Sequence, residues 1–122
     1  MLFMNRSRVL VACQLRSYRE VISAAFRVLR PDIEVFEAEE EDLDREVDRL
    51  DPDVVVCSQL TARVEARTPN WVELYPRCGS LSVVNIGGER STIEEIQLSD
   101  LLSIVDSAAQ TVRPCPSASR AP

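Results

Sequence analysis

The chain of 122 residues contains no lysine and no histidine, so all 14 of its basic residues are arginine. The lack of histidine removes the commonest general base, the usual phosphate donor in a phosphorelay and the commonest metal ligand. Aromatic residues are also scarce, at 5% of the chain, whereas hydrophobic residues make up 45% of it. This composition is enough for one domain with a modest aliphatic core.

Basic residues are fewer than acidic ones, 14 against 20, which gives the chain a net charge of −6. Nucleic acids and anionic membranes both attract proteins with excess positive charge, so we expect neither as a partner. The first apolar run, residues 9–13, is too short for a signal peptide or a membrane span, and Arg16 and Arg19 follow it closely. These features predict a cytoplasmic protein.

The four cysteines are scattered along the chain as Cys13, Cys57, Cys78 and Cys115. None of them has the closely spaced cysteine partner of a zinc site. In a reducing compartment such cysteines are free thiols by default. We therefore predict neither a bound metal nor another cofactor.

Two aliphatic runs predict central strands of a sheet. Residues 9–13 and 54–57 are apolar throughout, as is typical of parallel strands covered by helices on both faces. Residues 32–37 alternate like a more exposed strand, and residues 17–29 and 39–50 have the apolar spacing of helices. Two strand–helix units with such short connections imply a right-handed crossover and a parallel sheet. The inward face of the first helix is expected to consist of Val21, Ile22, Ala25, Phe26 and Leu29.

The second half of the chain departs from this rhythm. The strand-like runs Trp71–Tyr75 and Leu81–Ile86 flank a turn, which is the spacing of a β-hairpin. Ile93 and Ile96 are assigned to a small extra edge segment, and Ser99 begins a final helix.

The domain is therefore expected to span residues 1–112. Residues 113–122 have no apolar period and are expected to form a flexible tail. The expected fold class is α/β, a doubly wound sheet of three parallel strands followed by a β-hairpin, with about three main helices.

Four short motifs stand in register with one known pattern: Val9-Leu10-Val11-Ala12, Arg19-Glu20, Pro31-Asp32-Ile33-Glu34-Val35 and Pro52-Asp53-Val54-Val55-Val56. On these motifs, residues 8–58 resemble the first half of a response-regulator receiver domain, especially the kind joined to helix-turn-helix output domains. The resemblance implies a flavodoxin-like sheet and a signalling role.

The same resemblance exposes missing chemistry. In receivers the positions that match Cys13 and Gln14 are acidic and hold Mg²⁺, and the position that matches Ser58 is the phosphorylated aspartate. Hard cations need anionic oxygen ligands, which a thiol, an amide and a hydroxyl do not replace. The lysine of the family has no match in a chain without lysine. The resemblance therefore implies a pseudo-receiver with a degenerate phosphoacceptor site, which binds a protein partner or a second copy of itself without catalysis or metal.

Two alternatives remain open, and both use Cys13. Arg19 follows it by six residues between a strand and a helix, and this spacing resembles the phosphate loop of low-molecular-weight tyrosine phosphatases and arsenate reductases. That resemblance implies a thiolate nucleophile and an arginine clamp on phosphate, although no glycine stands between the two residues to help the loop amides turn inward. Cys13 and Cys57 also end neighbouring strands, which suggests a thiol redox sensor.

Overall fold

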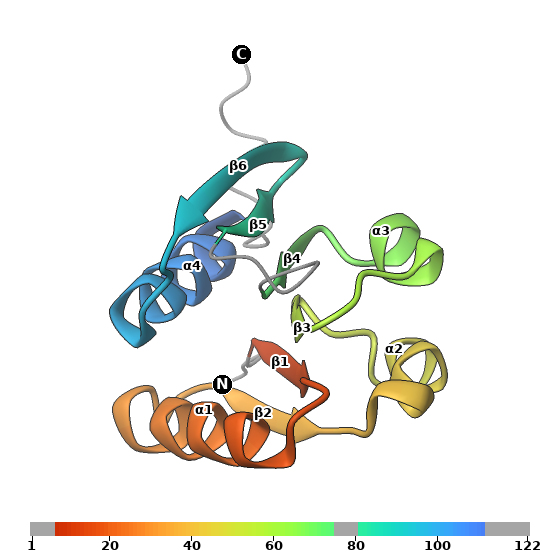
Figure 1. The fold of residues 1–122 in the computed structure, drawn as a ribbon, viewed down its shortest axis with the longest axis horizontal. Helices are drawn as coiled ribbons and strands as arrows, with labels where there is room; N and C mark the ends of the chain where they lie inside the picture. The colour runs from red at the N-terminus through yellow and green to blue at the C-terminus, as the bar shows by residue number, and fades with distance from the viewer. Residues whose placement is uncertain (1–6, 75–80, 112–122) are drawn as a thin grey trace, which may run out of the picture.

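A mixed sheet of six strands forms the central layer of the structure (Figure 1). The computed structural model describes residues 7–74 and 81–111, so the predicted tail, Cys78 and Cys115 lie outside the described residues. The described elements, in chain order, are β1 (Arg8–Ala12), α1 (Arg16–Leu29), β2 (Glu34–Glu37), the 3₁₀ helix η1 (Glu40–Asp42), α2 (Leu43–Leu50), β3 (Val54–Cys57), α3 (Ala62–Arg67), β4 (Asn70–Glu73), β5 (Leu81–Ile86), β6 (Glu89–Glu94) and α4 (Leu98–Thr111). This succession of strands and helices around one sheet confirms the predicted α/β class.

The sheet is parallel in its first four strands and antiparallel in its last two. The order across it is β2-β1-β3-β4-β5-β6. β1 pairs in parallel with β2 and β3, so both aliphatic runs lie inside the sheet, as predicted. β4 pairs in parallel with β3 and antiparallel with β5, where Trp71 stands opposite Asn85. The antiparallel pairing predicted for these two runs is therefore confirmed, whereas Tyr75 and the turn after it lie outside the described residues.

Three elements of the second half differ from the sequence prediction. Four strands are parallel rather than three, because β4 extends the parallel sheet before the chain reverses. Helix α3 is absent from the prediction because Val64 is its only buried residue, which leaves no apolar period to detect. β6 is a full strand of six residues rather than a small edge segment. It reverses from β5 through Gly87 and Gly88, whose positive φ angles suit a tight hairpin turn.

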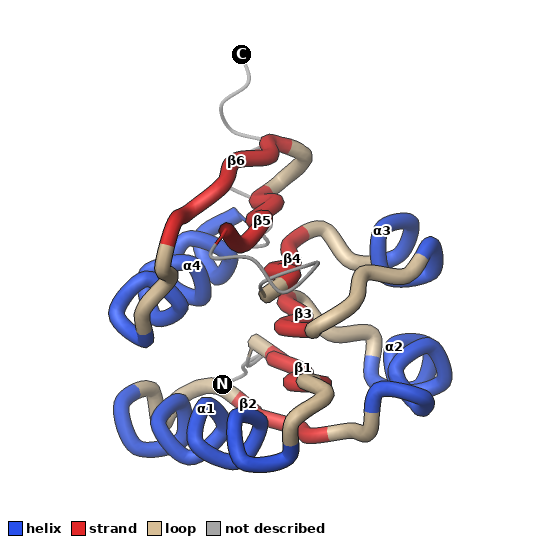
Figure 2. Tube along the Cα trace, in the orientation of Figure 1, coloured by secondary structure: helices blue, strands red, loops and turns tan. Residues whose placement is uncertain are grey.

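Helices cover both faces of the sheet in pairs (Figure 2). Val9 and Val11 belong to the core under α1 and α4, whereas Leu10 and Ala12 belong to the core under α2 and α3. This division follows from the alternation of side chains along a strand. Leu10 and Val55 are completely buried, which confirms that the two aliphatic runs are interior strands.

Candidate functional site

The three residues predicted to form a degenerate switch pocket, Cys13, Gln14 and Ser58, come together at the carboxyl edge of β1 and β3. The backbone N–H of Gln14 donates a hydrogen bond to the Oγ of Ser58, with 2.8 Å between the two atoms. Cys13, one residue before, is completely buried. Within residues 7–74 and 81–111, no group of three or more histidine, cysteine, aspartate or glutamate side chains is arranged to hold a metal ion. This edge therefore presents a hydroxyl engaged with the backbone and a buried sulfur.

The Cys13 thiol is in an environment that keeps it protonated. Burial raises its pKa from 9.0 to about 11, and this effect outweighs the lowering by the positive charge of Arg19 and by hydrogen bonding with Ser58. A thiol needs to ionise to act as a nucleophile or as a metal ligand. At neutral pH Cys13 is therefore a neutral, unreactive group.

Arg19 is buried beside Cys13, and its guanidinium bonds to backbone carbonyl oxygens. Its Nη1 donates to the carbonyl oxygens of Cys13, at 3.3 Å, and of Ala38, at 3.4 Å. Its Nη2 lies 3.6 Å from Oε2 of Glu39, and its Nε lies 4.0 Å from Oε1 of Glu37. The guanidinium thus connects the loop after β1 to the segment after β2. The carboxylates of Glu37 and Glu39 occupy the side of the guanidinium where a phosphatase would bind the phosphate.

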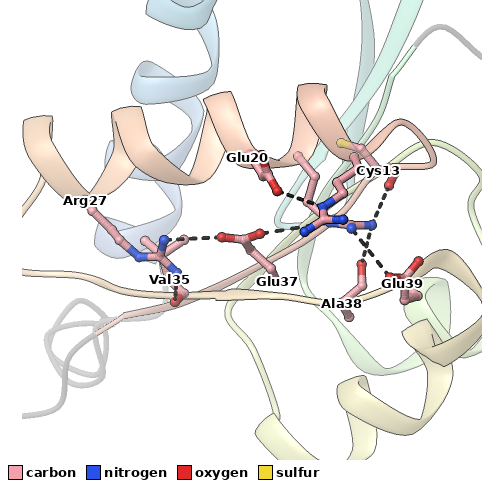
Figure 3. Close-up of polar contacts among 9 residues, drawn as sticks. Cys13, Glu20, Arg27, Val35, Glu37, Ala38 and Glu39 are labelled. Carbon is pink, nitrogen blue, oxygen red and sulfur yellow. Dashed lines mark hydrogen bonds and ion pairs between the residues drawn. The ribbon is translucent and has the colours of Figure 1, made fainter.

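Glu37 is shared between two arginines, which extends this ionic cluster along α1. Nη1 of Arg27 lies 3.2 Å from Oε2 of Glu37, and its Nη2 donates to the carbonyl oxygen of Val35 at 3.1 Å. Glu37 therefore pairs with both Arg19 and Arg27. Figure 3 shows its side chain between Arg27 on one side and Ala38 and Glu39 on the other. The edge strand β2 is therefore held against α1 by charged groups.

A shallow basin of about 450 Å³ opens beside this cluster. Charged side chains line almost all of it: Arg16, Arg19, Glu20, Glu37, Ala38, Glu39, Asp42, Glu46 and Arg49. Its two outer arginines are already paired, since Arg16 lies 2.8 Å from Glu20 and Arg49 lies 2.6 Å from Glu46. Carboxylates outnumber arginines in this lining, so the basin does not favour a phosphate or another anion.

The two described cysteines lie in different cores. Cys13 belongs to the core under α1 and α4, and Cys57 to the core under α2 and α3. The Cys57 thiol donates to the carbonyl oxygen of Val72 at 3.6 Å, and burial raises its pKa above the ordinary value. Since the sheet lies between the two side chains, a disulfide between them would require movement of the backbone.

A surface that sequence reasoning missed runs along α1. The structure has six exposed large hydrophobic residues among those it describes, and five of them lie on α1 or directly before it: Leu15, Tyr18, Val21, Val28 and Leu29, with Leu81 as the sixth. The sequence predicted Val21 and Leu29 on the inward face of this helix, and that prediction is wrong, because both side chains are exposed. The buried face of the helix consists of Arg19, Ile22, Ser23 and Phe26.

The wrong prediction of the inward face of α1 has a physical cause, and the sequence contains a pattern that could have corrected it. Arg19 and Ser23 are buried because the guanidinium finds carbonyl partners in the interior and Ser23 is small. Apolar residues therefore occupy more of α1 than the core can cover. A helical projection shows the excess, because the exposed charged residues Arg16, Glu20 and Arg27 all fall on one flank.

An apolar cleft of about 150 Å³ adjoins this surface between α1 and the start of α4. It is lined by Tyr18, Val21, Ile22, Leu74, Ile96, Gln97, Leu98 and Leu101. The cleft continues the exposed apolar surface of α1 toward α4. Together they form a continuous apolar surface on the described part of the chain.

No protein-family model, curated protein or solved structure gives a significant match to the chain. None of the helices in the described part of the chain is long and apolar enough to cross a membrane.

Proposed function

We propose that the protein is a non-catalytic signalling or regulatory module, a pseudo-receiver that works by binding protein. The strand order β2-β1-β3-β4 with parallel pairing supports a flavodoxin-like arrangement, in which the chain winds in both directions from β1. The antiparallel strands β5 and β6 then take the place of a further parallel strand. The buried free thiols Cys13 and Cys57 fit the reducing conditions of the cytoplasm, where we place the protein.

The observation that carries the proposal is the state of the edge where a receiver would be phosphorylated. Ser58 accepts a hydrogen bond from the Gln14 backbone and has a buried neutral thiol as its neighbour. A Mg²⁺ ion needs anionic oxygen ligands, and this edge supplies a hydroxyl, an amide side chain and a thiol instead. The hydrogen bond between Gln14 and Ser58 gives this edge a structural role, because it links the loops after β1 and β3.

The same geometry weighs against the two thiol-based alternatives. A phosphatase-like enzyme needs an accessible thiolate, whereas Cys13 is completely buried and its pKa is raised to about 11. Arg19 donates to the Cys13 carbonyl oxygen and is paired with carboxylates. A redox sensor based on Cys13 and Cys57 would require two thiols on opposite faces of the sheet to meet.

The apolar surface of α1 supplies the positive side of the proposal. Soluble proteins rarely leave contiguous apolar surface exposed unless it is used for binding. Val21 is 65% exposed and Val28 is 75% exposed, on a helix whose opposite face is fully packed. We therefore assign the binding of a protein partner to this helix.

Beryllofluoride with Mg²⁺ tests the degenerate site. We expect the amide spectrum of the ¹⁵N-labelled protein to stay unchanged around Gln14 and Ser58, because neither the acceptor carboxylate nor the metal ligands are present. The double variant Gln14→Asp, Ser58→Asp, which puts two carboxylates at this edge, serves as the comparison in which Mg²⁺-dependent shifts are expected. A saturable, Mg²⁺-dependent shift at Ser58 in the unmodified protein would refute the proposal.

A further inference from the structure

The outer face of α1 carries no charged side chain. Arg16 and Glu20 pair with each other on one flank of the helix, and Arg27 pairs with Glu37 on the same flank. The face turned away from this flank consists of small and apolar residues: Ser17, Tyr18, Val21, Ala24, Ala25 and Val28. Tyr18, Val21 and Val28 are exposed on it, as are the neighbouring Leu15 and Leu29. We call Leu15 and the residues of this outer face the α1 stripe.

The charge of the protein restricts what binds to the α1 stripe. The chain has a net charge of −6, so two copies repel each other wherever acidic surfaces meet. The uncharged α1 stripe is where two copies can approach with the least repulsion. The carboxylates of the basin lie beside the charged flank of α1, and no residue of the α1 stripe lines the basin. A basic partner would instead be drawn toward those carboxylates.

The α1 stripe is also complementary to itself. Val21 lies near its middle, with Leu15 six residues before and Val28 seven residues after. If two α1 helices pack antiparallel around a two-fold axis midway between residues 21 and 22, Leu15 of one copy lies against Val28 of the other. Tyr18 then lies over Ala24 and Ala25 of the second copy, so the largest side chain of the stripe meets its smallest ones.

We propose that two copies of this chain associate through antiparallel packing of their α1 helices around a two-fold axis close to Val21. The inference rests on the proposed function and names the second copy as the protein partner. α1 has 14 residues and is about 21 Å long, so a single helix pair forms a small interface. We therefore expect a weak, reversible dimer with a dissociation constant in the micromolar range.

Sedimentation of the full chain over a range of about 10 to 500 μM tests the dimer. The apparent mass should rise from 13.7 kDa toward twice that value as the concentration increases. The variants Val21→Glu and Val21→Arg should each sediment as monomers, because each places two like charges at the axis. Val21 is 65% exposed, so neither substitution is expected to change the thermal unfolding of the monomer.

Mixing the two variants distinguishes a second copy from any other partner. Only if residue 21 faces itself will the Val21→Glu and Val21→Arg chains form a mixed dimer, and we expect their mixture to recover association at least to the wild-type level. Leu81→Glu is the matched control, because Leu81 is 49% exposed but lies on β5, and it should dimerise like the wild type.

Four results would overturn the inference: a wild-type protein that stays monomeric at the highest concentration, a dimer that Val21→Glu leaves intact, a mixture that stays monomeric, or a dimer lost equally in Leu81→Glu. The beryllofluoride experiment can be carried out on the monomeric Val21→Glu variant. Failure of the dimer is therefore separable from failure of the proposed function.

Discussion

The backbone N–H of Gln14 and the Oγ of Ser58 are joined by a hydrogen bond of 2.8 Å between residues 44 apart in the sequence. The bond links the loops that leave the neighbouring strands β1 and β3. It engages the hydroxyl of Ser58 with the backbone. Ser58 is therefore expected to contribute to stability rather than to signalling chemistry.

Replacing Ser58 tests this role. Ser58→Ala removes the acceptor of the Gln14 N–H and should lower the free energy of unfolding by about 1 kcal/mol. Ser58→Thr retains a hydroxyl and should remain close to the wild type. Urea unfolding followed by circular dichroism measures both, and equal stability of the alanine and threonine variants would show that the bond contributes nothing.

Arg19 should be more important to stability than any exposed arginine of α1. Arg19→Met leaves the carbonyl oxygens of Cys13 and Ala38 without this donor and should cost about 1–3 kcal/mol in the free energy of unfolding. Arg19→Lys should recover only part of this loss, because an ammonium group lacks the planar fork that reaches several acceptors. Arg16→Met, which removes a guanidinium on an exposed side chain, is the control. Equal effects at the two positions would contradict the bracing role of Arg19.

Leu10 tests the position of β1 in the sheet. Leu10→Ala should lower the free energy of unfolding by about 2–5 kcal/mol, because the side chain is completely buried and its loss leaves a cavity. Leu81→Ala removes the same atoms from a half-exposed position and should have a much smaller effect. Denaturant midpoints that move equally in the two variants would mean that β1 is not a central strand.

Stability should fall in alkaline solution because of Cys13. Its pKa is raised from 9.0 to about 11 in the folded protein, so the unfolded chain loses this proton at lower pH than the folded one. The contribution of the protonated Cys13 thiol to the free energy of unfolding is complete below about pH 9, and it is lost as the pH rises toward 11. Unfolding in urea at pH 7, 9 and 10 should show a steeper decline for the wild type than for Cys13→Ala. A parallel decline in the two proteins would mean that Cys13 titrates normally.

The same burial predicts slow reaction of the thiol. After a short iodoacetamide pulse at neutral pH, mass spectrometry should find Cys13 and Cys57 largely unmodified, because both are completely buried and protonated. The same pulse applied in urea should modify both. Rapid labelling of Cys13 in the folded protein, blocked by phosphate, would instead support the phosphatase-like alternative.

The interior of the sheet could be predicted from the sequence because burial on both faces leaves an unmistakable apolar run. Val54, Val55 and Val56 are all buried, and no helix of this length would consist of β-branched residues alone. The switch-pocket positions could also be predicted as neighbours, since the parallel pairing of two such runs brings the ends of both strands to one edge.

What could not be predicted depends on tertiary partners. The burial of Arg19 follows from two carbonyl groups that reach it from distant parts of the chain, and no local pattern contains that information. Because Arg19 faces the core, Val21, which is two residues further along the helix, faces the solvent and forms part of the α1 stripe. β6 escaped prediction for a related reason: all of its residues except Ile93 are exposed, so it has no apolar alternation.

The exposed strand β6 leaves one edge of the sheet open to pairing with another molecule. It lies at one end of the sheet, and no other strand of the described residues covers its outer edge. An uncovered edge of six residues is a template for a strand of another molecule. Glu89, Arg90 and Glu94 stand along it, and charges of this kind resist such growth, because a flat stack of identical strands would align each charge with its own copy.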